Sequence, residues 1–100
     1  MYIAMNRFKI VKGKETEFIN IWKGRESFLE SVPGFKQFNL LQGSDTDEHS
    51  LFASHAIWET EADFVNWTKS DAFKKAHANA GASREIYLGP PNFEGFEVIL

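Results

Sequence analysis

Residues 2–11, YIAMNRFKIV, alternate between two kinds of side chain, which is the pattern of a β-strand. One face of this strand is apolar except at a single position, and it carries Tyr2, Ala4, Asn6, Phe8 and Ile10. The opposite face includes the cations Arg7 and Lys9, which favour solvent. The first face is therefore expected to point inward, with Asn6 as a polar residue on an otherwise apolar surface.

The pattern changes to a helical period beyond Gly13. Apolar side chains then recur at helical spacings, which predicts a helix over residues 14–32, ended by Pro33 and Gly34. The positions that form this apolar stripe are Phe18, Ile21, Trp22, Leu29 and Val32.

Residues 35–43 and 50–59 are predicted strands, and the polar residues 44–49 join them as a hairpin loop. A second helical region covers residues 60–80. Thr60 is expected to cap its first part, residues 61–69, and Ser70 or Asp71 to cap its second part. Gly81 would end it, and residues 82–92, with Gly89-Pro90-Pro91, are expected to be irregular. Residues 93–100 form the last predicted strand.

The predicted order is β-α-β-β-α-β, the ferredoxin-like α+β arrangement of an antiparallel sheet with helices on one side. The 100 residues are expected to form a single domain. Because the helices cover only one face of the sheet, the other face needs a cover. A second copy of the same sheet is the simplest one, so we expect a homodimer.

Composition excludes several classes of function. The chain has no cysteine, which rules out zinc–thiolate sites, iron–sulfur clusters and a cysteine nucleophile. The net charge is −3 and basic residues form no stripe, so nucleic acid is not an expected partner. No apolar run approaches the ~20 residues that span a bilayer, and the first residues do not resemble a secretion signal. The expected location is the cytoplasm, with no membrane partner.

Three residues stand out as candidates for chemistry: Asn6, Trp67 and His77. His77 follows Phe73 by one helical turn, so the two share a helix face. Alanines surround His77 in the sequence and leave room for a bulky group against the helix. Each candidate also has an ordinary structural role: His77 as a surface or hydrogen-bonded histidine, Asn6 as a buried amide paired with backbone, and Trp67 as a core residue.

The remaining motifs are weaker. His49 lies in a polar turn, and His55 shares a strand face with Leu51, Ala53 and Ile57, which suits a core or a subunit contact. No pair of histidines or carboxylates has the spacing of a non-heme metal site. The sequence contains neither a glycine-rich phosphate loop nor a G-x-S-x-G motif. A single axial histidine is all that five-coordinate heme requires of a protein.

Residues 64–77, FVNWTKSDAFKKAH, contain the pattern W-x-x-S-x-x-F-x-x-A-H. This segment resembles the heme-binding helical region of the IsdG-type heme-degrading monooxygenases, in the antibiotic biosynthesis monooxygenase (ABM) superfamily of dimeric α+β barrels. Trp58-Glu59 resembles the family's junction into that region, and Asn6 matches the family's strand asparagine. Asparagine, tryptophan and histidine together are the family's functional triad.

The resemblance implies that heme is both substrate and cofactor, with molecular oxygen and an external reductant or reductase as co-reactants. His77 would be the axial ligand of the heme iron. Asn6 would lie on the distal side and donate a hydrogen bond that orients oxygen. Trp67 would press on the porphyrin face and ruffle it, and the products would be iron and an open tetrapyrrole.

Further contacts follow from the same resemblance. Phe64 and Phe73 would line the heme pocket, and Arg84 would reach a propionate, although a solvated loop cation is the simpler interpretation of Arg84. After His77 the chain is shorter than typical members, and Gly89-Pro90-Pro91 would reshape one edge of the pocket. Two alternatives remain open: a cofactor-free monooxygenase of small quinols or aromatics, and a non-catalytic heme-binding dimer.

Overall fold

The computed structural model describes residues 1–24, 29–76 and 84–100. Its elements in chain order are β1 (Tyr2–Ile10), α1 (Glu15–Lys23), a 3-10 turn (Leu29–Ser31), β2 (Phe35–Asp45), β3 (Ser50–Trp58), α2 (Glu61–Thr68), α3 (Asp71–Ala76), a second 3-10 turn (Arg84–Ile86) and β4 (Asn92–Glu97). The predicted β-α-β-β-α-β order is confirmed, and so is the division of the second helical region into two parts.

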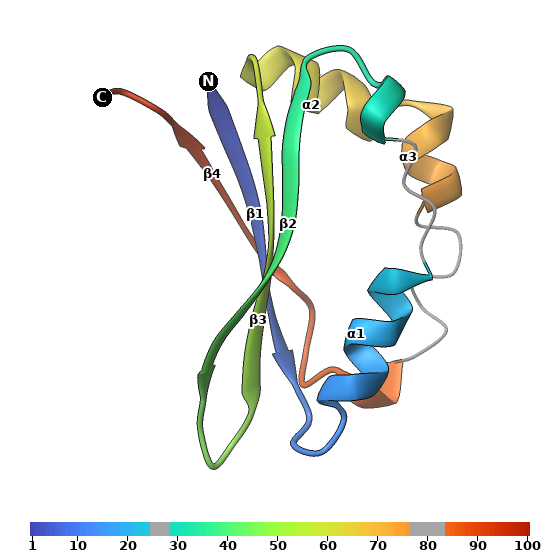
Figure 1. Cartoon of the computed structure of the whole chain (residues 1–100), viewed down its shortest axis with the longest axis vertical. Coiled ribbons are helices and arrows are strands. Elements are labelled where there is room, and N and C mark those ends of the chain that lie inside the picture. Colours follow the sequence, from blue (N-terminus) through green and yellow to red (C-terminus); the bar gives the residue numbers. More distant parts are fainter. Residues whose placement is uncertain (25–28, 77–83) are drawn as a thin grey trace.

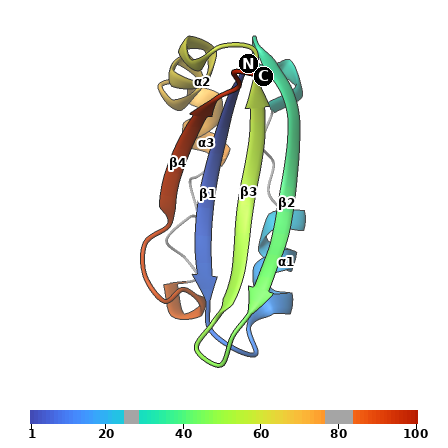
Figure 2. The ribbon, with the colours of Figure 1, turned by 90° about the vertical axis from the view of Figure 1, so that its left-hand side faces the viewer.

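The strands form one four-stranded antiparallel sheet in the order β2-β3-β1-β4. All three helices lie on one side of this sheet (Figure 1). The view onto the opposite side shows the strands in front of the helices, with none of the described helices over them (Figure 2). This is the predicted ferredoxin-like arrangement. In the described residues, no helix is long and apolar enough to cross a membrane.

The register of the sheet determines which side chains meet the helices. β1 and β3 pair without a break from Tyr2 opposite Trp58 to Ile10 opposite Ser50. Because side chains alternate along a strand, the helix-facing set of β1 includes Asn6, as predicted. β2 pairs with β3 less regularly, with shifts in register near both of its ends.

The predicted helix over residues 14–32 is wrong in its length. α1 ends at Lys23, where the N–H of Gly24 donates to the carbonyl of Asn20 at 3.1 Å. Leu29 begins a separate 3-10 turn. The apolar positions of residues 14–32 do not pack on one surface: Phe18 belongs to one core cluster and Leu29 to another. One continuous helix is therefore not needed to bury them. Two strand ends also differ from the prediction: β2 extends to Asp45, and β4 stops at Glu97.

The core of the described residues consists of two clusters, one at each end of the helix-facing side of the sheet. We call the first the α1 cluster: Phe8, Ile10, Phe18, Phe52 and Ile86, all buried. The second, the α2 cluster, has Tyr2, Ala4, Leu29 and Trp58 as its buried members. Phe64 and Trp67 of α2 pack against it.

Predicted capping residues fix where α2 and α3 begin. The hydroxyl oxygen of Thr60 accepts a hydrogen bond from the N–H of Asp63 at 3.1 Å. Ser70, one of the two predicted caps of the next helix, accepts from the N–H of Phe73 at 3.2 Å. Gly34 has a φ of +83°, and Asp63 occupies the space that a Cβ at Gly34 would need. The start of α2 is therefore held against the turn before β2.

Candidate functional site

Asn6 lies half-buried on β1, on the helix-facing side between Ala4 and Phe8. Its cross-strand partners are Ser54 on β3 and Phe93 on β4. The Asn6 amide makes no side-chain hydrogen bond with any part of the chain that the structure describes, so the alternative of an amide paired with backbone is not observed there. Asn6 thus keeps its full capacity to donate and accept hydrogen bonds.

Asn6 and Ser54, which we call the polar pair, stand between the two core clusters. Ser54 is only 7% exposed and lies on the same face of the sheet as Phe52 and Ala56. Phe8 and Phe52, on one side of the pair, belong to the α1 cluster, and Ala4, on the other, belongs to the α2 cluster. The helix-facing surface of the sheet therefore carries two polar groups at its middle, where neither cluster reaches.

Aromatic side chains from α2, α3 and β4 stand beside the polar pair. The rings of Phe64 and Phe93 stack with centroids 5.5 Å apart and an interplanar angle of 4°. The ring of Trp67 meets that of Phe73 edge-on, with centroids 4.8 Å apart, and its centroid lies 6.3 Å from that of Phe64. We call these four residues the aromatic wall. Since Phe93 pairs with Asn6 across the strands, the wall begins next to the asparagine.

The aromatic wall is supported from behind by fully buried rings. Trp58 is 0% exposed, and its ring centroid lies 5.5 Å from that of Trp67 and 5.9 Å from that of Phe64. Tyr2 contacts Phe64 at 5.7 Å and lies over Gly95, where any Cβ would clash with its ring. Burial raises the pKa of the Tyr2 phenol, and the carboxylates of Glu61 and Glu97 add to this effect. Trp67 is thus held firmly, with one part of its surface still accessible.

The structure places four of the six predicted site residues in one region: Asn6, Phe64, Trp67 and Phe73. His77 lies outside the described residues, immediately after α3, so its role as axial ligand stays a prediction. Arg84 begins the second 3-10 turn, and its predicted contact with a propionate is likewise untested. His55 lies half-buried on the open face of the sheet, between Met5 and Asn39, and takes no part in this region.

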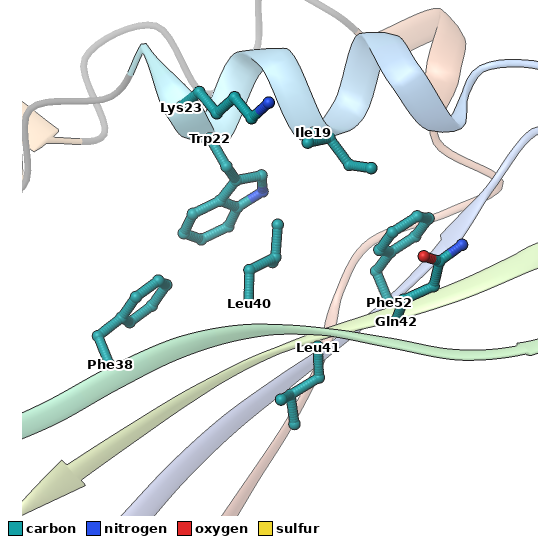
Figure 3. Close-up of a pocket in the computed structure, with 8 residues that line it drawn as sticks. All are labelled: Ile19, Trp22, Lys23, Phe38, Leu40, Leu41, Gln42 and Phe52. Carbon is teal, nitrogen blue, oxygen red and sulfur yellow. The ribbon is translucent and has the colours of Figure 1, made fainter.

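A hollow of about 360 Å³ lies between α1 and β2. No feature of the sequence predicted it. Figure 3 shows Ile19, Trp22 and Lys23 of α1 above it and Phe38 and Leu40 of β2 below, while Leu41 points to the other side of the strand. Trp22 stacks on Phe38 at 5.6 Å and meets Phe8 edge-on at 5.8 Å. Leu40 pairs with Ser54, so the hollow lies on the β2 side of the polar pair. In size and apolar lining it resembles part of a small-molecule site.

Comparison with known proteins identifies the family. Residues 1–79 match the family described as antibiotic biosynthesis monooxygenase. A protein of Staphylococcus epidermidis named heme oxygenase (staphylobilin-producing) is 36% identical over 86 residues, which are 85% of this chain and 81% of that protein. The chain belongs to the antibiotic biosynthesis monooxygenase family.

Solved structures that share this fold are described as carrying out different chemistry. MhuD from Mycobacterium tuberculosis, described as a heme-degrader with two hemes bound in its active site, is 25% identical with a TM-score of 0.76, over 100% of this chain and 97% of that one. SnoaB from Streptomyces nogalater, described as a cofactor-independent oxygenase, is 21% identical with a TM-score of 0.70, over 99% of this chain and 93% of that one. The ABM fold alone therefore does not choose between these reactions.

Proposed function

We propose that this family member is a heme-degrading monooxygenase, which binds heme through His77, opens the porphyrin oxidatively and releases iron. The observation that carries the proposal is the aromatic wall standing beside Asn6, whose amide has no hydrogen-bond partner in the described residues. The name of the Staphylococcus epidermidis relative supports the same activity.

The chemistry of the described residues suits heme. A porphyrin buries two wide apolar faces and needs few polar contacts, which suits a wall of aromatic rings with one amide at its base. The sheet residues next to the polar pair on the α2-cluster side are small, because Ala4 and Ala56 face each other across the strands. Bound heme would supply an iron that binds and activates molecular oxygen, and an external donor would supply the electrons.

Three residues would divide the work of the protein. His77 would offer a neutral imidazole nitrogen to the iron. The Asn6 Nδ2–H would donate a hydrogen bond that orients the oxygen substrate, since no described residue competes for it. Trp67 would press on the macrocycle and bend it, because the rings of Trp58 and Phe73 pack against Trp67 and hold it in place. Phe64 and Phe73 would keep water from the reacting carbon.

A homodimer and a cytoplasmic location are parts of this proposal. The open face of the sheet exposes apolar side chains that a monomer would leave in water. Ile3 lies between Ile57 and Phe96 in register, and Leu41 on β2 extends the same surface. A second copy of the sheet would cover them. Sedimentation of the ligand-free chain tests this part separately from the activity.

The activity is tested by titrating the chain with hemin and following the Soret band, then adding ascorbate in air with catalase present. Saturable binding followed by loss of the band, with an open tetrapyrrole and one iron per heme as products, is the expected result. Stable binding without loss would indicate a heme carrier. An absence of saturable binding would favour the cofactor-free oxygenase and contradict the proposal.

A further inference from the structure

One row of side chains crosses all four strands on the helix-facing side of the sheet. In register, it runs from Phe93 on β4 through Asn6 on β1 and Ser54 on β3 to Leu40 on β2. Because neighbouring strands lie about 4.8 Å apart, the two ends of this row are separated by roughly 14 Å. The polar pair therefore has an aromatic neighbour on one side and an aliphatic neighbour on the other.

The two ends of this row belong to different apolar surfaces. Phe93 is part of the aromatic wall, whereas Leu40 lines the hollow of about 360 Å³ between α1 and β2. Phe52, two residues before Ser54 on the same face of β3, also lines the hollow. The wall, the polar pair and the hollow thus form one continuous surface, which we call the strip. A flat apolar ligand that is wider than the polar pair would contact the strip on both sides of it.

Lys23 gives the hollow a positive charge at its rim. It is the only charged residue among the described residues that line the hollow, and Figure 3 shows it on the α1 side, across from Leu40. It is the last residue of α1, whose acidic residues Glu15 and Glu17 lie in the first turn. Lys23 is exposed and forms no ion pair with residues 1–24, 29–76 or 84–100. Its ammonium group can therefore bind an anion held in the hollow.

We propose that the bound porphyrin extends from the aromatic wall over the polar pair into the hollow, where the Lys23 ammonium group pairs with one propionate carboxylate. This inference rests on the proposed function, because it concerns how the same heme is held. Heme is an apolar macrocycle with carboxylates along one edge. The strip matches it with apolar side chains and a cation at its α1 end. Since heme carries two propionates, this ion pair is additional to the contact expected for Arg84.

The ion pair is tested by the hemin affinities of Lys23→Gln and Lys23→Arg. We expect Lys23→Gln to weaken hemin binding about two- to fivefold, the strength of an exposed ion pair, and Lys23→Arg to retain the parent affinity. The loss should disappear with hemin dimethyl ester, whose esterified propionates carry no charge, and should shrink in about 1 M salt. Lys14→Gln is the matched control, because it makes the same change on the same helix at a residue paired with Glu17. An unchanged hemin affinity in Lys23→Gln, or equal losses for hemin and its dimethyl ester, would overturn the ion pair.

The position of the porphyrin is tested by NOEs in the complex with gallium protoporphyrin, which is diamagnetic and does not activate oxygen. We expect NOEs from the methyl groups of Leu40 and Ile19 to porphyrin protons, and none from Leu41, which points to the other side of β2. NOEs from Phe93 without any from Leu40 or Ile19 would overturn the extension into the hollow and leave the proposed function standing. If the parent binds neither hemin nor the gallium porphyrin, the proposed function itself fails, and this inference fails with it.

Discussion

The buried members of the two core clusters are equally closed, but the second cluster is bordered by aromatic rings that stay accessible. In the α1 cluster, Phe18 and Ile86 are 0% exposed, and α1 seals them against the sheet. Around the α2 cluster, Phe64, Trp67 and Phe73 stay half-buried, and Phe93 is 49% exposed. Aromatic residues thus stabilise the fold at one end and present a surface at the other. The aromatic residues of the two regions differ in how much of each side chain is exposed, and not in residue type.

The largest effect on stability is expected from Phe18→Ala in the α1 cluster. Phe18 contacts the rings of Phe8 and Phe52 at 5.4 and 4.8 Å, so its removal leaves a cavity among rigid neighbours. We expect the free energy of unfolding to fall by about 3–5 kcal/mol in urea titrations. Phe73→Ala, on the half-buried wall, should cost clearly less. Equal losses at the two positions would break the distinction between a sealed cluster and an accessible border.

Among the described residues, the largest effect on binding is expected from Trp67→Ala. Removing this ring takes away the part of the wall that Trp58 and Phe73 support, so hemin affinity should fall by about tenfold, or about 1.4 kcal/mol. Trp67→Phe should keep most of the affinity while flattening the porphyrin modestly, which the hyperfine-shifted NMR signals of the ferric complex report. An unchanged affinity in Trp67→Ala, or identical ruffling in Trp67→Phe, would count against the wall as a binding surface.

Asn6→Ala should separate stability from activity. Because the amide has no hydrogen-bond partner in the described residues, replacing it by alanine should leave the free energy of unfolding the same or raise it by up to ~1 kcal/mol. Hemin should still bind, but its oxidation should slow strongly or stop. A variant that loses stability yet degrades heme at the parent rate would show that Asn6 is a structural residue.

The smallest effect concerns the far end of the β2–β3 hairpin, near the α1 cluster. Hydrogen bonds from Lys12 and Ser50 lower the pKa of the Asp45 carboxyl. Its contribution to stability is therefore present above the carboxyl's ordinary pKa and is lost as the pH falls through the lowered one. The difference in unfolding free energy between parent and Asp45→Asn should be small at neutral pH and vanish in acid, with hemin affinity unaffected. A difference in unfolding free energy between parent and Asp45→Asn that grows as the pH falls would contradict this prediction.

The sequence predicts the fold well because each element carries a local signal. The alternation of residues 2–11 places Asn6 on the inner face, and Thr60 and Ser70 mark two helix starts that the structure confirms. The break after Lys23 could not be predicted, because Phe18 and Leu29 keep a helical spacing although they pack in different clusters.

The site was only partly predictable for a related reason. Asn6 could be named from the alternation of its strand, and Phe64, Trp67 and Phe73 from the segment 64–77, but Ser54 and Phe93 join them only through the register of three strands. Ser54 follows an ordinary alternating pattern, and nothing in the linear sequence distinguishes it from Ser50. The hollow under Trp22 likewise depends on how α1 lies over β2.

In the proposed heme site, the aromatic wall and Asn6 surround the porphyrin and His77 holds its iron. The chain contains three histidines, so His49→Ala and His55→Ala are matched controls for His77→Ala. The most direct measurement is the iron–histidine stretching band in resonance Raman spectra of the ferrous complex. We expect only His77→Ala to remove this band. Its persistence in His77→Ala, or its loss in either control, would show that His77 is not the iron ligand.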